Sequence, residues 1–192
     1  MAELVPRLPY DDIDQIVGAL FQAIEEERTV FVFGNGGSAA AASHMMCDIN
    51  KGTREQGESR RPRVLALTDN VALLTAWAND RGFEQVFSEQ MKTFVRRGDV
   101  AFAISASGNS PNVVRGLRTA RRRGAFTAGI SGFQGGRMRE LCDLCAVVPS
   151  DNMQMIEDMH HAMLHSMFTA LRQRLRASRR GSLAVADGYT PS

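Results

Sequence analysis

The sequence is poor in cysteine, in aromatic residues and in long apolar runs. Its 192 residues include three cysteines, one tryptophan and 7% aromatic residues in all. Three cysteines, an odd number in a chain of this length, do not fit a disulfide framework. No apolar run approaches the ~20 residues of a membrane-spanning helix, and the first residues, with Glu3 and Pro6, lack a signal-peptide pattern. We therefore expect a cytoplasmic protein that does not bind a membrane.

A large excess of charge of either sign is also absent. Lys and Arg total 23 and Asp and Glu total 21, so the formal net charge of +2 gives no general argument for nucleic-acid binding. The hydrophobic content of 44% and the charged content of 23% are ordinary for a globular protein. The length suits one α/β domain with a full core. We expect that domain over residues 1–177 and a disordered tail over 178–192, where apolar residues are few.

Short apolar stretches alternate with segments of helical spacing. The pattern predicts an amphipathic helix over 11–27 and a polar loop over 51–61, and it places a helix break at 79–82. Because helices and strands alternate, we expect a parallel sheet covered on both faces, with ligands beyond the carboxyl ends of its strands. The predicted strands are 30–33, 64–68, 99–105, 125–130 and 146–148, and the further predicted helices are 39–50, 71–78, 83–95, 111–123, 137–141 and 152–176.

The first predicted strand is followed by Gly34-Asn35-Gly36-Gly37-Ser38. The glycines allow a tight turn, and Ser38 is expected to cap the next helix. Free backbone N–H groups and the partial positive charge of a helix N-terminus favour an anion here. The pattern is neither a Walker loop, which ends in Lys-Ser/Thr, nor a dinucleotide fingerprint, which has a third glycine. A tight turn with nothing bound is the alternative interpretation.

The third predicted strand leads into a second polar loop, Ser105-Ala106-Ser107-Gly108-Asn109-Ser110. It offers three hydroxyls and no Lys or Arg, which suits a sugar phosphate held by neutral donors better than a nucleoside triphosphate with Mg²⁺. A capping turn is the alternative, because serine commonly caps helices. Since both loops follow strands of one parallel sheet, we expect them to converge at its carboxyl edge.

Ionisable residues recur at helical spacing on two of the predicted helices. His44 and Asp48 lie four residues apart, and Glu157, His161 and His165 follow one another at intervals of four. Two helices that each carry a carboxylate and an imidazole can bind zinc or a similar divalent ion. They can equally transfer protons without a metal. Histidines packed in the core are the alternative.

Three other features carry less functional information. Cys142 and Cys145 form a Cys-x-x-Cys pair, but no second pair completes a zinc site, so core positions are expected. Residues 121–123 are all arginine and are interpreted as a solvated helix end. The ten methionines are interpreted as packing residues in the core or between subunits.

Taken in order, these motifs resemble a known family. The Gly-Asn-Gly-Gly-Ser loop with a histidine six residues later, the pair Asn79-Asp80, the Ser-x-Ser-Gly-Asn-Ser loop and the histidine-bearing last helix resemble the sugar isomerase (SIS) domain. They are most similar to the phosphoheptose isomerases, which interconvert sedoheptulose 7-phosphate and a heptose 7-phosphate. The resemblance covers residues 11–176. It implies a flavodoxin-like, three-layer α/β/α fold with a parallel five-stranded sheet, a divalent metal such as zinc, and a homotetramer with sites between subunits.

The resemblance also implies roles for individual residues. Asp48 and His165 match the residues that transfer protons, and His160 matches a further histidine of the last helix. The matched metal ligands are His44, Asp48, Glu157 and His165. The matched substrate contacts are Asn35, Gly36, Gly37, Ser38, Asn79, Asp80, Ser105, Ala106, Ser107, Ser110 and Glu157.

Two positions depart from the family pattern. Asp48 stands where the family has Glu, and Glu157 stands where it has Gln. Both positions keep a possible ligand or base, but the departures leave open an isomerase of a different sugar phosphate. A non-catalytic SIS protein, such as a scaffold that binds a replication initiator, is the alternative from another functional class. The set of four ionisable residues favours the enzyme, because a scaffold does not need them.

Overall fold

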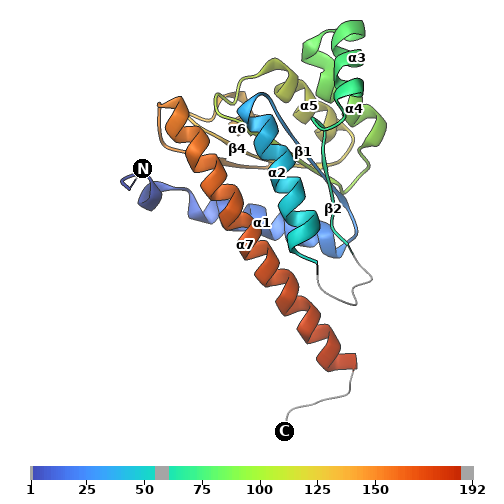
Figure 1. The fold of residues 1–192 in the computed structure, drawn as a ribbon, viewed down its shortest axis with the longest axis vertical. Helices are drawn as coiled ribbons and strands as arrows, with labels where there is room; N and C mark the ends of the chain where they lie inside the picture. Colours follow the sequence, from blue (N-terminus) through green and yellow to red (C-terminus); the bar gives the residue numbers. More distant parts are fainter. Residues whose placement is uncertain (1, 55–60, 187–192) are drawn as a thin grey trace.

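The computed structural model describes residues 2–54 and 61–186, and its centre is a parallel five-stranded sheet (Figure 1). The strand order is β2-β1-β3-β4-β5, and every neighbouring pair is parallel. This order is that of a flavodoxin-like doubly wound sheet. The predicted fold class and all five predicted strands are therefore confirmed. The strands are β1 (Thr29–Gly34), β2 (Arg63–Ala66), β3 (Val100–Ser105), β4 (Phe126–Ser131) and β5 (Leu144–Val147).

Helices cover both faces of the sheet. The first, second and last helices pack in one hydrophobic cluster on one face, and the fourth, fifth and sixth pack in a second cluster on the other. The third helix adds only partly buried residues to the second cluster. The helices are α1 (Tyr10–Glu25), α2 (Gly37–Gly52), α3 (Val71–Arg81), α4 (Val86–Phe94), α5 (Pro111–Arg122), α6 (Gly136–Leu141) and α7 (Met153–Ala186), with short 3₁₀ turns at Val5–Arg7 (η1) and Phe83–Gln85 (η2).

The two hydrophobic clusters divide the side chains of each central strand between them. In β1, Val30 and Val32 belong to the cluster under α1, α2 and α7, whereas Phe31 and Phe33 belong to the cluster under α4, α5 and α6. This is the period of two that a strand imposes on its side chains. All six residues of β1 and all six of β3 are buried, as is typical of central strands in a parallel sheet.

The strand order places the topological switch point between β1 and β3. β1 pairs with β2 on one side and with β3 on the other, and Gly34 at the end of β1 is paired with Ile104 near the end of β3. The connections from these two strands run to opposite faces of the sheet, which opens a crevice at their carboxyl ends. The two polar loops singled out in the sequence both begin at this edge.

Three boundaries differ from the sequence prediction. Ser38 does not cap α2, because Gly36, at φ +54, lets the helix begin two residues earlier than predicted, at Gly37. Asn79, Asp80 and Arg81 belong to α3, which ends at Arg81 before the capping Gly82 (φ +91), rather than before the predicted break over 79–82. The long last helix continues to Ala186, so residues 178–186 of the predicted disordered tail are helical. Residues 187–192, and 55–60 of the predicted polar loop, lie outside the described residues.

Within the described ranges, no helix combines the length and the apolar character needed to cross a membrane.

Candidate functional site

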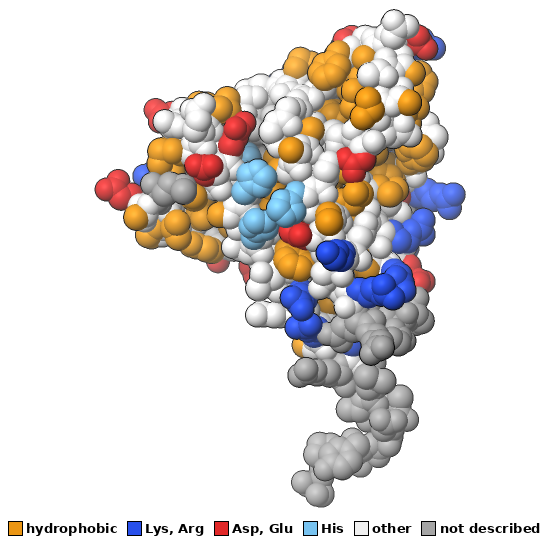
Figure 2. Space-filling view, viewed as in Figure 1, with side chains coloured by type: hydrophobic (Ala, Val, Ile, Leu, Met, Phe, Trp, Pro, Cys, Tyr) orange, Lys and Arg blue, Asp and Glu red, His pale blue; other side chains and the backbone are white. Residues whose placement is uncertain are grey.

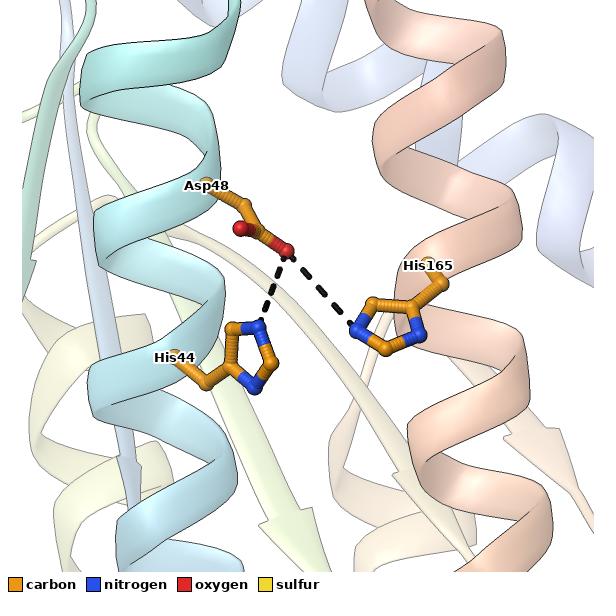
Figure 3. A group of neighbouring side chains, drawn as sticks. All are labelled: His44, Asp48 and His165. Atoms are coloured by element: carbon orange, nitrogen blue, oxygen red, sulfur yellow. Dashed lines mark ion pairs between the residues drawn. The ribbon is translucent and has the colours of Figure 1, made fainter.

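Two helices on one face of the sheet bring together His44, Asp48 and His165, here called the histidine cluster (Figure 3). His44 and Asp48 lie one turn apart on α2, and His165 faces them from α7, which packs beside α2. The Nε2 atom of His44 lies 3.4 Å from Oδ2 of Asp48, and Nε2 of His165 lies 3.9 Å from the same oxygen. The rings of His44 and His165 meet edge to face with centroids 5.0 Å apart. The predicted pairing of the two helices is therefore present.

The histidine cluster is open to solvent on one side. The side chains of His44 and His165 are 49% and 56% exposed, and that of Asp48 is 27% exposed. Figure 2 shows the histidine side chains gathered on one face of the molecule, with acidic atoms next to them. Both imidazoles have Nε2 directed at Oδ2 of Asp48, while Oδ1 of Asp48 has no partner among the described residues. One oxygen of the carboxylate is thus left for a further contact.

The donor set fits a divalent ion. Around a tetrahedral zinc ion with bonds of about 2.0–2.1 Å, ligand atoms lie roughly 3.3 Å from one another. The two nitrogen-to-oxygen distances of 3.4 and 3.9 Å are close to that spacing, and one donor atom from each of the three residues lies within 4.8 Å of the others. Two imidazoles and one carboxylate are also the usual ligands of catalytic zinc.

Glu157 and His161 continue the row of His165 along α7 toward the sheet edge. His161 lies 6.4 Å from His44, measured between ring centroids. Glu157 lies outside the histidine cluster, with its carboxylate oxygens next to Gly37, about 3.6 Å from where a side chain at Gly37 would begin. The structure therefore brings together three of the four predicted metal ligands. The role of Glu157 as a ligand stays a prediction.

The loop after β1, residues 34–38, is held by a non-local pair of amides. Asn35 Nδ2 donates to Oδ1 of Asn112 at 2.8 Å, and Asn112 Nδ2 donates back to Oδ1 of Asn35 at 2.8 Å. Asn112 is buried in the first turn of α5, so this pair ties the first loop to the helix that follows the second loop. Gly36 is needed at its positive φ, which places it at the start of α2 with the helix N–H groups beyond it.

The loop after β3, residues 105–110, is here called the serine loop. Ser105 Oγ and Ser110 Oγ lie 3.4 Å apart, and the backbone N–H of Asn109 donates to Oγ of Ser107. Gly108, at φ +63, has the carbonyl of Gly135 2.0 Å from the position of an added Cβ, so only glycine fits there. The loop therefore has a fixed shape with its hydroxyls grouped together.

The two loops converge at the switch point, as expected. They line a hollow of about 150 Å³ that also receives Glu157 and Met153 from α7. A smaller hollow of about 30 Å³ beside it shares Ser38 and Glu157 and adds His160 and His161. Glu157 thus lies between the serine loop and the histidines. The predicted contact residues that line the larger hollow are Asn35, Ser38, Ser105, Ala106, Ser107, Ser110 and Glu157.

Two predicted contact residues lie elsewhere in the chain. Asn79 and Asp80 are exposed near the end of α3, and Asn79 Nδ2 donates to Oδ1 of its neighbour Asp80 at 2.9 Å. Neither residue lines the hollows at the switch point. Within one chain they are therefore not part of the converged site.

His160 is the buried histidine of this region. It is 2% exposed, and neither ring nitrogen forms a well-aligned hydrogen bond within the part of the chain that the structure describes. Burial lowers the pKa of His160 to about 4, and the nearby backbone of Ser131 offsets this only in part. His160 is therefore neutral at neutral pH, and it borders the smaller hollow as a buried residue.

Sequence reasoning missed Asn112 and did not assign a role to His161. Asn112 sits in the first turn of a helix, where asparagine is common, and its partner is 77 residues away. Its only sequence signal was its place two residues after Ser110. His161 shows the same spacing of four as Glu157 and His165, and that spacing does place it beside His44.

Comparison with known proteins gives consistent matches. The family model described as "SIS domain" matches residues 4–132. The phosphoheptose isomerase of Pelobacter propionicus is 38% identical over 175 residues, which cover 91% of this chain and 92% of that protein. The phosphoheptose isomerase of Rhodospirillum rubrum is 40% identical over 157 residues, which cover 80% of each chain.

Solved structures agree with the sequence matches. A phosphoheptose isomerase from Neisseria gonorrhoeae superposes with a TM-score of 0.79 at 30% identity and covers 85% of this chain and 86% of its own. One from Francisella tularensis has a TM-score of 0.81 at 28% identity and covers 90% of each chain. The fold, the two converging loops and these matches lead to one conclusion: the chain belongs to the SIS domain family.

Proposed function

We propose that the chain is an aldose–ketose isomerase that interconverts sedoheptulose 7-phosphate and a D-glycero-heptose 7-phosphate. Relatives named phosphoheptose isomerase, at 38–40% identity over most of the chain, support an isomerase of this type. The observation that carries the proposal is the row of side chains on α7, which runs from the serine loop to the histidine cluster. The serine loop at one end of this row suits a phosphate, and the histidine cluster at the other end suits proton transfer.

The serine loop and the start of α2 support phosphate binding. Ser105, Ser107 and Ser110 offer hydroxyl donors, and the α2 N-terminus offers backbone N–H groups with a partial positive charge. Glu157 and His165 are eight positions apart, which is about 12 Å along the helix axis. A substrate whose phosphate lies on the serine loop needs an extended carbon chain to reach the cluster. This length favours a seven-carbon sugar over a triose.

The histidine cluster supplies the groups for a 1,2-isomerisation. Oδ1 of Asp48, which has no partner among the described residues, removes the proton from the carbon next to the carbonyl and returns it to the neighbouring carbon. His165 moves the proton between the two sugar oxygens. Positioned acids and bases of this kind each contribute about 10²–10⁴-fold to a rate.

His44, Asp48 and His165 would hold a divalent ion, and zinc fits their donor set and spacing. When bound, such an ion polarises a carbonyl or hydroxyl oxygen. Glu157 faces the serine loop in this geometry, so we assign it to the substrate end of the site.

We also propose that the protein is a homo-oligomer, most simply a tetramer, in the cytoplasm. Asn79 and Asp80 lie away from the site of their own chain, which is expected if they complete the site of a neighbouring subunit. Val71 on α3 is 67% exposed and Phe83 on η2 is 54% exposed. These apolar side chains lie on the same part of the molecule and suit a subunit contact. Light scattering tests the assembly, and a monomer with full activity would contradict it.

The deciding experiment is incubation of the purified, metal-analysed protein with sedoheptulose 7-phosphate, followed by NMR. We expect an aldoheptose phosphate to form, to stop forming with a chelator, and to form again when zinc is added. No turnover by a folded, metal-loaded protein would contradict the proposed substrate. A panel of ketose and aldose phosphates then distinguishes another isomerase from a protein that binds without turnover.

A further inference from the structure

A second hollow, of about 350 Å³, lies on the opposite face of the sheet between α4, α5 and α6. Its volume is in the range of small-molecule pockets. Among the residues that the structure describes, no Asp or Glu lines it, although the chain as a whole is nearly balanced in charge. The cationic residues around it, here called the basic hollow, are Lys92 from α4, Arg115, Arg118 and Arg122 from α5, and Arg137 from α6.

The spacing of these cations is unfavourable for an ordinary solvated helix. Arg115 and Arg118 are three residues apart on α5, and Arg118 and Arg122 are four apart, so like charges adjoin on one helix face. Such pairs destabilise a helix by a few tenths of a kcal/mol each. α5 contains no acidic residue that could offset them. An anion in the basic hollow would remove this repulsion.

Most of these cations are not engaged by other protein groups. Across residues 2–54 and 61–186, the side chains of Arg115, Arg118 and Arg137 have no hydrogen-bond or ion-pair partner. Arg122 donates to Oγ1 of Thr119 at 3.3 Å, and Lys92 is paired with Glu89 at 2.6 Å outside the lining.

The neighbouring arginines of α5 behave differently. Arg121 donates to the Leu141 carbonyl at 3.1 Å, and Arg123 donates to the Val95 carbonyl at 2.9 Å. Both therefore connect structural elements and point away from the basic hollow. Residues 121–123 are all exposed at the end of α5, so their interpretation as a solvated helix end is confirmed, although Arg121 and Arg123 also bond to backbone carbonyls. Three guanidinium groups without a partner among the described residues thus border one hollow.

We propose that the basic hollow is a binding site for a small polyphosphorylated molecule, of the nucleoside diphosphate class. Setting aside the paired Lys92, four guanidinium groups from two helices surround it. A terminal phosphate group carries about 1.5 to 2 negative charges at pH 7 and the inner phosphate of a diphosphate about one more, so a diphosphate brings roughly three negative charges to these cations. Guanidinium groups bind phosphate oxygens through paired, charge-assisted hydrogen bonds.

The basic hollow adjoins the serine loop without sharing its lining. Pro111, the first residue of α5, lines the basic hollow, and the preceding Ser110 lines the hollow at the switch point. The backbone N–H of Arg137 donates to Oδ1 of Asn109 in the serine loop at 3.0 Å. A ligand that binds Arg137 and shifts its backbone therefore also shifts the serine loop, which we assign to the sugar phosphate.

The test is isothermal titration of the full-length protein with inorganic pyrophosphate, and then with ADP, in buffer at physiological ionic strength. We expect both to bind the wild-type protein. The double variant Arg115→Ala/Arg118→Ala should bind at least about 10-fold more weakly, because two charge-assisted contacts are lost. The charge-matched control Arg63→Ala/Arg96→Ala removes two exposed arginines outside the basic hollow and should change the affinity less than about twofold.

A second control separates this site from the proposed isomerase site. Ser107→Ala/His165→Ala alters the serine loop and the histidine cluster and should leave pyrophosphate binding unchanged. Loss of binding in this variant rather than in Arg115→Ala/Arg118→Ala would place the anion in the isomerase site and overturn the proposal. So would no binding to the wild type, or equal weakening in both arginine variants. A changed oligomeric state of Arg115→Ala/Arg118→Ala with no pyrophosphate binding would assign the basic hollow to a subunit contact instead.

Discussion

The histidine cluster and the serine loop lie at the two ends of one site, but they are built in opposite ways. The cluster consists of side chains on two long helices, its two histidines are about half exposed, and Oδ1 of Asp48 has no partner among the described residues. The serine loop is irregular backbone whose polar groups bond to one another and to α6, with glycine where no side chain fits.

The difference follows from what each end has to do. A group that transfers protons needs a rigid support and a free atom, and helices α2 and α7 supply the support through the core beneath them. A group that binds a phosphate needs several donors in a fixed arrangement, which a short loop provides once its own hydrogen bonds are made. Changes at the cluster should therefore lower kcat, and changes at the loop should raise KM.

The largest effect is expected at the base. Asp48→Asn keeps the shape of the side chain but removes the proton acceptor, so kcat should fall by about 10²–10⁴-fold. Asp48→Glu keeps a carboxylate and should retain measurable turnover. Steady-state kinetics and circular dichroism of both variants test this. A near-normal kcat in Asp48→Asn would remove Asp48 from the chemistry.

The serine loop should respond in KM. Ser107→Ala/Ser110→Ala removes two hydroxyls that line the hollow at the switch point. Hydrogen bonds to charged groups contribute about 1.5–3 kcal/mol each, so KM for the sugar phosphate should rise by roughly 100-fold or more. The value of kcat should change much less. An equal fall in kcat would show that the loop also positions the reacting carbons, and the contrast between the two ends would fail.

Between the two ends, the buried His160 should make the protein sensitive to acid. Its pKa is lowered to about 4 in the folded protein by burial, so the unfolded chain binds a proton at higher pH than the folded one does. The contribution of the neutral His160 to the free energy of unfolding is fully present above about pH 6.5. It is lost as the pH falls toward 4, and the loss amounts to at most about 3 kcal/mol.

Urea unfolding at pH 7 and at pH 4.5 measures this effect. The free energy of unfolding should decrease less between pH 7 and pH 4.5 in His160→Asn than in the wild type. His44→Asn, which removes a half-exposed imidazole, is the matched control for loss of a histidine. An unchanged pH dependence in His160→Asn would mean that the ring is not desolvated as its burial indicates.

The smallest effect is expected at Glu157. Its carboxylate lies by Gly37 and the serine loop, where it repels a phosphate. Glu157→Gln should therefore lower KM for the sugar phosphate by roughly threefold, with a smaller effect at high salt. Glu157→Asp keeps the charge and serves as control. A higher KM in Glu157→Gln would indicate that the carboxylate accepts a hydrogen bond from a substrate hydroxyl.

Local patterns were sufficient for the sheet and for much of the site. The apolar runs and their spacing predicted all five strands. The separation of four residues between His44 and Asp48 placed both side chains on one helix face. The rule that ligands bind at the carboxyl edge predicted the convergence of the two loops. These inferences hold because each depends on residues close in sequence or on the general geometry of parallel sheets.

Contacts between distant residues could not be predicted in this way. The Asn35–Asn112 pair and the basic hollow depend on how separate elements pack, and nothing local to Arg118 or Arg137 indicates that they line the same hollow. The predicted helix ends were wrong where the backbone conformation of a glycine decides where the helix starts or stops. Gly36 and Gly82 adopt positive φ, which moved one helix start and one helix end away from the positions that Ser38 and Asn79 suggested.

The amide pair between Asn35 and Asn112 also bears on how the protein ages. Asn35 precedes Gly36, and asparagine before glycine is the sequence most prone to deamidation, because an unhindered backbone nitrogen attacks the side-chain carbonyl. In the folded protein that carbonyl accepts a hydrogen bond from Nδ2 of Asn112, which restrains the Asn35 side chain. Asn112→Ala should therefore deamidate at Asn35 faster than the wild type during storage, as measured by mass spectrometry. If so, the same two hydrogen bonds that tie the first loop to α5 also slow its chemical damage.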